Sequence, residues 1–153
     1  MIIEDAAFND LKEILELQYL AYQSEAILNS DFSIPPLLQI LEEVQQEFHS
    51  GKILKAVADG TIIGSVRGRV QNNTLLIGKL IVHPNLQGKG IGTKLLQAIE
   101  RAYPTLSYEL FTSNKSEKNL RLYEHQGYKR FMEKQISPDL TFIYLEKKPI
   151  NMN

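Results

Sequence analysis

The feature that most constrains the fold of this 153-residue chain is a strand, a glycine-rich turn and a helix in direct succession between residues 76 and 103. An apolar run from Leu75 to Val82 predicts a strand that ends before Pro84. Glycines follow at positions 88, 90 and 92, and apolar residues then recur at helical spacing from Ile91 to Ala102. This order brings bare backbone N–H groups to the positive end of a helix dipole, where glycines allow close approach. The segment therefore predicts a site for a phosphate or pyrophosphate.

Two common phosphate-binding loops do not fit this spacing. A P-loop requires Gly-Lys followed by Ser or Thr, whereas Gly88-Lys89 is followed by Gly90. The dinucleotide fingerprint requires its third glycine three positions after the second, whereas Gly92 follows Gly90 directly after Ile91. A glycine-rich turn that simply enters an ordinary helix is the remaining alternative at this point.

Composition limits the class of protein. The length suits a single domain over residues 1–153, and 43% hydrophobic with 23% charged residues are globular values. A net charge of −1 leaves no basic footprint, so we expect no nucleic-acid partner. The absence of cysteine excludes disulfides and thiolate chemistry, and no metal-ligand spacing occurs, so we expect no metal. Without a long apolar run or a basic leader, we expect a cytoplasmic protein with no membrane partner.

Hydrophobic periodicity predicts the remaining elements. Helices are expected from about residue 9 to 22, from Pro35-Pro36 to Gly51, over the segment after the glycine turn, and from about 116 to 126 before Gly127. Strands are expected near residues 1–6, 53–58, 61–70, 74–82, 107–112, 128–136 and 141–147.

Short turns and one crossover then predict the topology. Turns at Asp59-Gly60 and at residues 71–73 join three strands in an antiparallel meander. The helical crossover makes the strands at 74–82 and 107–112 parallel neighbours. The expected fold class is α/β (α+β): a mixed, largely antiparallel sheet of about seven strands with about four helices.

A second motif stands one strand downstream of the glycine turn. Residues 119–128 read Asn-Leu-Arg-Leu-Tyr-Glu-His-Gln-Gly-Tyr. This segment and Gln87-x-x-Gly90-x-Gly92 resemble the two recurrent motifs of the GCN5-related N-acetyltransferase (GNAT) family, in that family's order and spacing. The resemblance covers residues 1–147 and implies the GNAT acyl-CoA N-acyltransferase fold, with splayed parallel strands near residues 76–82 and 107–112. It also implies transfer of an acetyl group from acetyl-CoA to a primary amine of a small molecule, peptide or protein, by a monomer or homodimer.

The resemblance places coenzyme A between the two splayed strands. Backbone groups of Leu80, Ile81 and Val82 are expected to pair with the pantetheine amides, and the amide of Ile81 or Val82 to polarise the thioester carbonyl. Backbone N–H groups between residues 88 and 93 are expected to hold the pyrophosphate. Ser116 stands where many family members carry a pantetheine-binding asparagine, and Asn119 is a candidate substitute. The remaining residues expected at the coenzyme are Gln87, Gly88, Lys89, Gly90, Ile91, Gly92 and Thr93.

Acetyl transfer requires a neutral amine, a stabilised oxyanion and a proton for the departing thiolate. By resemblance, Tyr123 is the candidate general acid. The strand before the glycine turn lacks the carboxylate that many members use as a base, which leaves Glu109 on the neighbouring strand as the candidate in sequence. A water chain without a dedicated base fits equally well. Tyr22 and Glu25, near the end of the first helix, are candidates for the acceptor side. A catalytically silent acyl-CoA-binding or regulatory module on the same fold is the alternative function.

Overall fold

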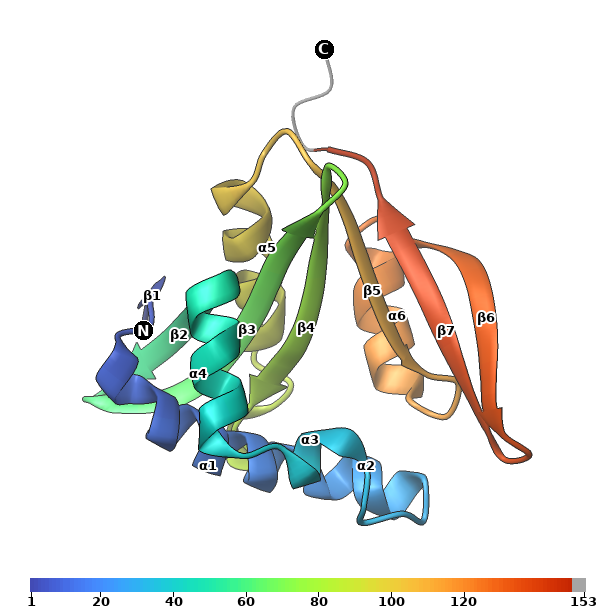
Figure 1. Cartoon of the computed structure of the whole chain (residues 1–153), viewed down its shortest axis with the longest axis horizontal. Coiled ribbons are helices and arrows are strands. Elements are labelled where there is room, and N and C mark those ends of the chain that lie inside the picture. Colours follow the sequence, from blue (N-terminus) through green and yellow to red (C-terminus); the bar gives the residue numbers. More distant parts are fainter. Residues whose placement is uncertain (150–153) are drawn as a thin grey trace.

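The seven strands form one sheet in the order β1-β2-β3-β4-β5-β7-β6, seen in a computed structural model that describes residues 1–149 (Figure 1). The β4–β5 pair is parallel, and the other neighbouring pairs among the described strands are antiparallel. This confirms the predicted fold class. The strands are β1 (Ile2–Asp5), β2 (Lys52–Ala58), β3 (Thr61–Gln71), β4 (Thr74–Val82), β5 (Ser107–Ser113), β6 (Lys129–Ser137) and β7 (Leu140–Lys147).

Helices cover both faces of the N-terminal half of the sheet. In Figure 1, α4 lies in front of β2 and β3, while α5 lies behind the sheet and α6 lies behind β5 and β7. No helix among the described residues is long and apolar enough to cross a membrane. The α-helices are α1 (Leu11–Ala21), α2 (Gln23–Leu28), α3 (Pro35–Leu38), α4 (Leu41–Ser50), α5 (Ile91–Ala102) and α6 (Glu117–His125); the short 3₁₀ turns are η1 (Phe8–Asp10) and η2 (Pro84–Leu86).

Strand alternation divides the core into two clusters, one on each face of the sheet. On β2, Ile53 belongs to the cluster with α1 and α4, whereas Leu54 belongs to the cluster with α5 and α6. Ile62 and Ile63 on β3 divide in the same way. Because successive side chains of a strand point to opposite faces, an apolar strand in this half is buried on both sides.

The first expected helix corresponds to η1 and α1, and α2 follows beyond its expected end, whereas the second expected helix is divided into α3 and α4. After α3, the backbone of Gln39 and Ile40 is extended, with ψ of 137° and 163°, before α4 begins. The Gln39 carbonyl accepts a hydrogen bond from the Tyr19 hydroxyl, and a Glu43 side-chain oxygen accepts one from the Ile40 N–H at 3.0 Å. Periodicity alone did not show this break, because tertiary hydrogen bonds replace those of a continuous helix.

The predicted turns are confirmed. Both central residues of the turn at Asp59-Gly60 have positive φ, 50° and 76°, as a type I′ hairpin requires. Asn72 and Asn73 have φ of 52° and 60° and form the next hairpin in the same way. These tight turns fix the register of the β2–β3–β4 meander.

The β4–β5 pair separates soon after it begins. Pairing covers only Thr74–Leu76 with Ser107–Glu109, and beyond this point the two strands diverge (Figure 1). The register of β4 against β3 also shifts near Lys79, whose φ is 50°. A bulge of this kind bends a strand and redirects its side chains. The sheet is therefore open at its centre, and the exposed edge of β4 faces the opening.

Candidate active site

The glycine turn links the end of β4 to the start of α5. Gly88 and Gly90 have φ of +78° and +83°, a region that residues with a Cβ rarely adopt. α5 begins at Ile91, and the Lys94 N–H makes the first intrahelical bond, to the Gly90 carbonyl at 3.1 Å. The three N–H groups before Lys94 are those that a helix N-terminus leaves without helical partners. They can bind an anion together with the helix dipole.

Gly92 has an ordinary helical φ, so its conformation does not require glycine. A Cβ added there would lie 3.7 Å from Val82 Cγ2 and 3.7 Å from Leu122 Cδ2, which is normal contact distance. These distances show that the start of α5 meets both the end of β4 and the helix that carries Tyr123. The glycine turn, the open edge of β4 and α6 therefore form one site.

The Gln87 side chain closes the turn onto β4. Its Nε2 donates to the Val82 carbonyl at 3.4 Å. Lys89 is exposed, as is the turn around it. The contact of Gln87 with the coenzyme stays a prediction, while its structural contact is to the strand end.

Tyr123 lies on α6 with 7% of its surface exposed, and its ring packs 6.1 Å from that of Tyr128. Burial raises the pKa of the Tyr123 phenol, and the nearby Tyr22 and Glu25 raise it further. Its hydroxyl makes no hydrogen bond to the described residues. Among those residues, Arg67 Nε is the only side-chain polar atom that is both fully buried and without a partner, so the Tyr123 hydroxyl is not fully buried. The Tyr123 hydroxyl therefore keeps contact with solvent. It is a protonated and available donor.

Glu25 of α2 holds the start of α6. Its carboxylate accepts hydrogen bonds from Ser116 Oγ at 2.8 and 2.7 Å and from Asn119 Nδ2 at 3.2 Å. Asn119 Nδ2 also donates to Thr112 Oγ1 at 3.3 Å. Ser116 and Asn119, predicted at the coenzyme, are thus brought together with Glu25, predicted on the acceptor side, across the end of the gap.

Tyr22 belongs to the same end of the gap. Burial raises the pKa of its phenol; Arg67 opposes this shift, while Glu25 and Glu47 add to it. The electrostatic influence of Tyr22 and Glu25 on Tyr123 shows that the first helical segment and α6 face each other here. The sequence placed these three residues at one site, and the structure does bring them together.

A cavity of about 370 Å³ lies beside the point where β4 and β5 separate. Its volume is within the range of about 300–1,000 Å³ that is usual for small-molecule sites. Glu109 lines it, opposite the last paired residue Leu76. The candidate base is therefore at the closed end of the gap. The other lining side chains that matter below are Glu47, Arg67, Arg69, Lys79, Phe111 and Tyr144.

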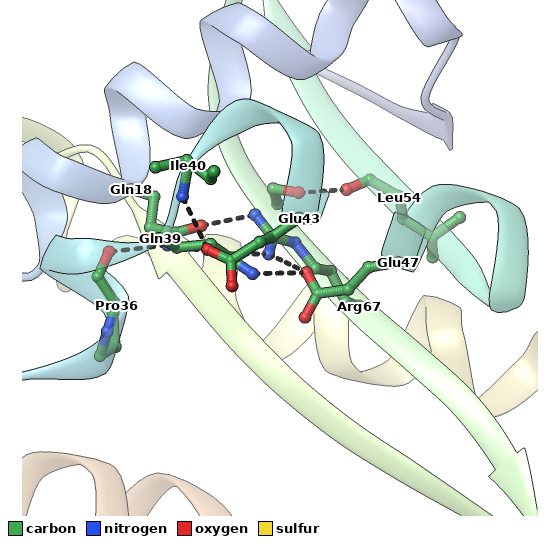
Figure 2. A network of polar contacts seen from close by, with 9 residues as sticks. Gln18, Pro36, Gln39, Ile40, Glu43, Glu47, Leu54 and Arg67 are labelled. Atoms are coloured by element: carbon green, nitrogen blue, oxygen red, sulfur yellow. Dashed lines mark hydrogen bonds and ion pairs between the residues drawn. The ribbon is translucent and has the colours of Figure 1, made fainter. Parts of the chain in front are cut away.

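Arg67 is the centre of a polar network that the sequence did not reveal (Figure 2). Its Nη1 contacts Glu47 Oε2 at 2.5 Å and Gln39 Oε1 at 2.9 Å, and its Nη2 donates to Gln18 Oε1. Gln18 Nε2 in turn donates to the Pro36 carbonyl at 2.8 Å. The network ties α1, α3 and α4 to β3, so it fixes α4, the helix that lines the cavity.

Two cationic groups of this cavity are incompletely paired. Arg67 is 5% exposed, and its Nε is buried without a hydrogen-bond partner. Leaving such a donor unpaired costs about 1–3 kcal/mol. Burial lowers the pKa of the Lys79 ammonium; Glu47 opposes the shift, while Arg67 adds to it. No local sequence pattern could have identified Arg67. The break in apolar alternation at Gly78-Lys79, in contrast, could have identified Lys79.

No cluster of three or more His, Cys, Asp or Glu side chains that could hold a metal ion occurs in residues 1–149. The site thus consists of backbone donors, the phenols of Tyr22 and Tyr123, several carboxylates, and the three basic side chains that line the cavity.

The comparisons with known proteins agree with this geometry. Residues 9–128 match the model of the acetyltransferase (GNAT) family. The UPF0157 protein YqkA of Bacillus subtilis is 28% identical over 120 residues, which are 78% of this chain and 34% of that protein. The chain thus spans about a third of the length of that relative.

Solved structures share the fold over nearly the whole chain. The ribosomal-protein-S18-alanine N-acetyltransferase of Escherichia coli superimposes with a TM-score of 0.81 at 14% identity, covering 99% of this chain and 95% of that one. The PaiA N-acetyltransferase of Thermoplasma acidophilum, in complex with coenzyme A, gives 0.73 at 20% identity, covering 96% and 98%. The aminoglycoside 6′-N-acetyltransferase of Enterococcus faecium gives 0.77 at 18%, covering 100% and 99%. With most of its length matched by the family model, the chain belongs to the acetyltransferase (GNAT) family.

Proposed function

We propose that this protein is an acetyl-CoA-dependent N-acetyltransferase that acetylates a primary amine. The observation that carries the proposal is the meeting of three elements at Gly92, which lies at normal contact distance from both Val82 at the end of β4 and Leu122 beside Tyr123. An anion-binding helix start, an unpaired strand edge and a phenol are thereby adjacent. The coenzyme A complex of the Thermoplasma relative supports the choice of donor.

The open edge of β4 suits the pantetheine arm. Beyond Leu76, no β5 residue pairs with β4, so the backbone groups of residues 80–82 that face the gap are available to amides. The N–H groups at the start of α5 suit the pyrophosphate. The amide of Ile81 or Val82 is our candidate for stabilising the oxyanion, since a fixed backbone donor needs no reorganisation during the reaction.

The reaction follows from these groups. The neutral amine nitrogen attacks the thioester carbon, forming the C–N bond and moving the carbonyl electron pair onto oxygen. Collapse of the tetrahedral intermediate breaks the C–S bond. The Tyr123 hydroxyl donates a hydrogen bond to the departing sulfur as negative charge develops there, and the proton of the new ammonium passes to Glu109 directly or through water. Protonation of the released thiolate, by Tyr123 or by water, completes coenzyme A. Products are the acetamide and coenzyme A.

The raised pKa of Tyr123 bears on its role. A phenol whose pKa lies above 10 is protonated throughout the physiological range, so it is always ready to donate. It transfers a proton to a thiolate less readily than a stronger acid would. Its main contribution in this scheme is therefore a hydrogen bond that strengthens as negative charge develops on sulfur.

Glu25 suggests the second candidate function, a module that binds acyl-CoA without catalysis. Ser116 and Asn119 already donate to the Glu25 carboxylate, which would have to share or release them when pantetheine enters. The test combines calorimetric titration of acetyl-CoA with a coenzyme A release screen over amino acids, polyamines, aminoglycosides and peptide N-termini. Acetylated product, identified by mass spectrometry, supports the enzyme. Binding of acetyl-CoA without turnover on any amine supports the silent module.

A further inference from the structure

The cavity at the β4–β5 gap has two chemically different walls. One wall comes from α4, β3 and β4 and carries Glu47, Arg67, Arg69 and Lys79. The other comes from β5 and β7 and carries Phe111 and Tyr144, together with Glu109 at the closed end of the gap. A ligand that fills the cavity therefore meets charge on one side and aromatic surface on the other.

The charged wall favours an anion. Three cationic and two carboxylate side chains line the cavity, and one carboxylate, that of Glu47, contacts the Arg67 guanidinium at 2.5 Å. No carboxylate of the described residues lies within 4 Å of the Lys79 ammonium. Arg67 adds a buried Nε without a partner to the same wall. Glu43 of α4 also acts electrostatically on Lys79 but lies outside the cavity lining. Along the lining itself, cations outnumber carboxylates, so this wall is complementary to a ligand carboxylate.

The backbone at Lys79 points to the same conclusion. Lys79 has φ of +50° at the bulge of β4, a conformation that is uncommon for a residue with a Cβ. Such residues concentrate where a side chain must be aimed at a ligand. Lys79 lies three residues beyond Leu76, the last β4 residue that pairs with β5, and it lines the cavity beside the gap.

The aromatic wall continues beyond the cavity. The rings of Phe111 and Tyr144 lie 5.2 Å apart, and those of Phe111 and Phe142 lie 4.8 Å apart. Phe111 is 49% exposed. Phe142 and Tyr144 are half-buried, and Figure 1 shows no helix in front of β5 and β7. Phe111 and Tyr144 line the cavity, and Phe142 extends the aromatic cluster beyond it. Exposed apolar strips next to a polar site are typical of ligand grooves.

Resting on the proposed function, we infer that the acceptor is a free α-amino acid with a large apolar or aromatic side chain. Its carboxylate binds Lys79, with Arg67 adding positive charge, and its side chain packs against Phe111 and Tyr144. Its amine points into the gap, near Glu109. Polyamines and aminoglycosides, which carry several cations and no carboxylate, are disfavoured by the same wall.

The test uses a matched set of amines with the full chain. L-phenylalanine and 2-phenylethylamine differ only in the carboxylate, while L-phenylalanine and L-alanine differ only in the ring; spermidine represents polycations. The quantity compared is kcat/KM for coenzyme A release, expressed per neutral amine. Thermal-shift titration with each amine alone reports acceptor binding independently of acetyl transfer. Variants are Lys79→Met, Phe111→Ala and, as a matched control, Lys12→Met on the exposed side of α1.

The expected pattern separates the two walls. Loss of the carboxylate lowers wild-type kcat/KM about 10- to 100-fold, the range for a charge-assisted hydrogen bond. Lys79→Met lowers kcat/KM about tenfold or more for L-phenylalanine and leaves 2-phenylethylamine unchanged within about twofold. Phe111→Ala lowers it for L-phenylalanine but not for L-alanine. Lys12→Met behaves as wild type.

Other outcomes are decisive as well. Equal kcat/KM for L-phenylalanine and 2-phenylethylamine, or the highest value for spermidine, overturns this inference while leaving the acetyltransferase intact. If L-phenylalanine binds in a Lys79-dependent way but acetyl-CoA does not bind, the amino-acid site is supported and the proposed function is overturned. If neither L-phenylalanine nor acetyl-CoA binds and no amine is acetylated, both the inference and the proposed function are overturned.

Discussion

The two sides of the β4–β5 gap are built in different ways. The side at α5 uses backbone: N–H groups at the start of the helix, the edge of β4, and glycines with positive φ at positions 88 and 90. The cavity side uses side chains such as Arg67, Lys79 and Glu109. Backbone geometry depends on a few glycines, whereas a side-chain wall changes with every substitution. One fold can therefore keep its donor and vary its acceptor.

Two buried polar networks show the same contrast. Glu100, 2% exposed, accepts from the Tyr128 hydroxyl at 2.6 Å and from Lys147 Nζ at 3.0 Å. This network joins α5 to the end of β7 and to the residue that precedes β6. The Arg67 network, in contrast, borders the cavity and leaves Nε unpaired. We interpret the first as structural and the second as part of the acceptor site.

The largest expected effect is a difference between these two networks in how much each contributes to the free energy of unfolding. Lys147→Met leaves the almost fully buried Glu100 carboxylate without its cation, so we expect a loss of about 3 kcal/mol in the free energy of unfolding. Arg67→Met should cost less, about 1–2 kcal/mol, because the side chain of Glu47 is 38% exposed and regains water. Urea denaturation measures both. A larger loss for Arg67→Met would contradict the assignment of the two networks.

The next effect concerns the phenol at the gap. Tyr123→Phe should lower kcat about 100-fold, within the usual range for a catalytic proton donor, while the Kd for acetyl-CoA stays within about twofold. Tyr103→Phe, on the loop after α5, is the matched control and should keep wild-type kcat. Steady-state kinetics and calorimetry provide the two numbers. Unchanged turnover in Tyr123→Phe would remove the residue from the mechanism.

A pair of glycine variants tests the backbone side. Gly92→Ala meets no neighbour closer than 3.7 Å and no unfavourable φ, so the free energy of unfolding should change by less than about 0.5 kcal/mol. If a pyrophosphate approaches this backbone, the new methyl group should weaken acetyl-CoA binding about tenfold. Gly60→Ala, in a hairpin with φ of +76°, should do the reverse: lose about 1 kcal/mol and keep the Kd. Equal Kd values for both variants would place the coenzyme elsewhere.

The smallest effect is a pH dependence of stability. Burial raises the pKa of the Tyr22 phenol in the folded state. Below pH 10 the phenol is protonated in both folded and unfolded chains, so it contributes no slope; above about pH 10 the unfolded chain loses its proton first and stability falls. Tyr22→Phe should therefore reduce the decline between pH 10 and 11 by about 1 kcal/mol. An unchanged slope, measured by urea denaturation, would show that the hydroxyl of the half-buried Tyr22 is not shielded from water at the gap.

The glycine turn at the start of α5 was predictable because its information is local. The glycine turn lies within one continuous stretch, and the motif around Tyr123 follows one strand later, so spacing along the chain reports spacing in the fold. The same holds for the hairpin at Asp59-Gly60, whose positive φ values follow from two residues. Element order and fold class followed from periodicity for this reason.

The side-chain wall of the cavity was not predictable because its contacts are distant in sequence. Arg67 meets Gln18 and Glu47 from two separate helices. The division of the second expected helix at Gln39 has the same origin, since hydrogen bonds from Tyr19 and Arg67 hold that residue in extended backbone. The propensities of neighbouring residues do not predict hydrogen bonds to residues that are distant in sequence. Glu25 was named from its place near the helix end, but its bonds to Ser116 and Asn119 emerged only from the fold.

The central claim, that acetyl-CoA binds in the β4–β5 gap against the start of α5, is tested most directly by titrating acetyl-CoA into ¹⁵N-labelled protein and following backbone amide shifts. We expect the largest shifts at Ile81, Val82, residues 88–93 and the start of α6, with little change at the hairpin around Gly60. No saturable binding, or the largest shifts on β1 and β2 away from the gap, would contradict it.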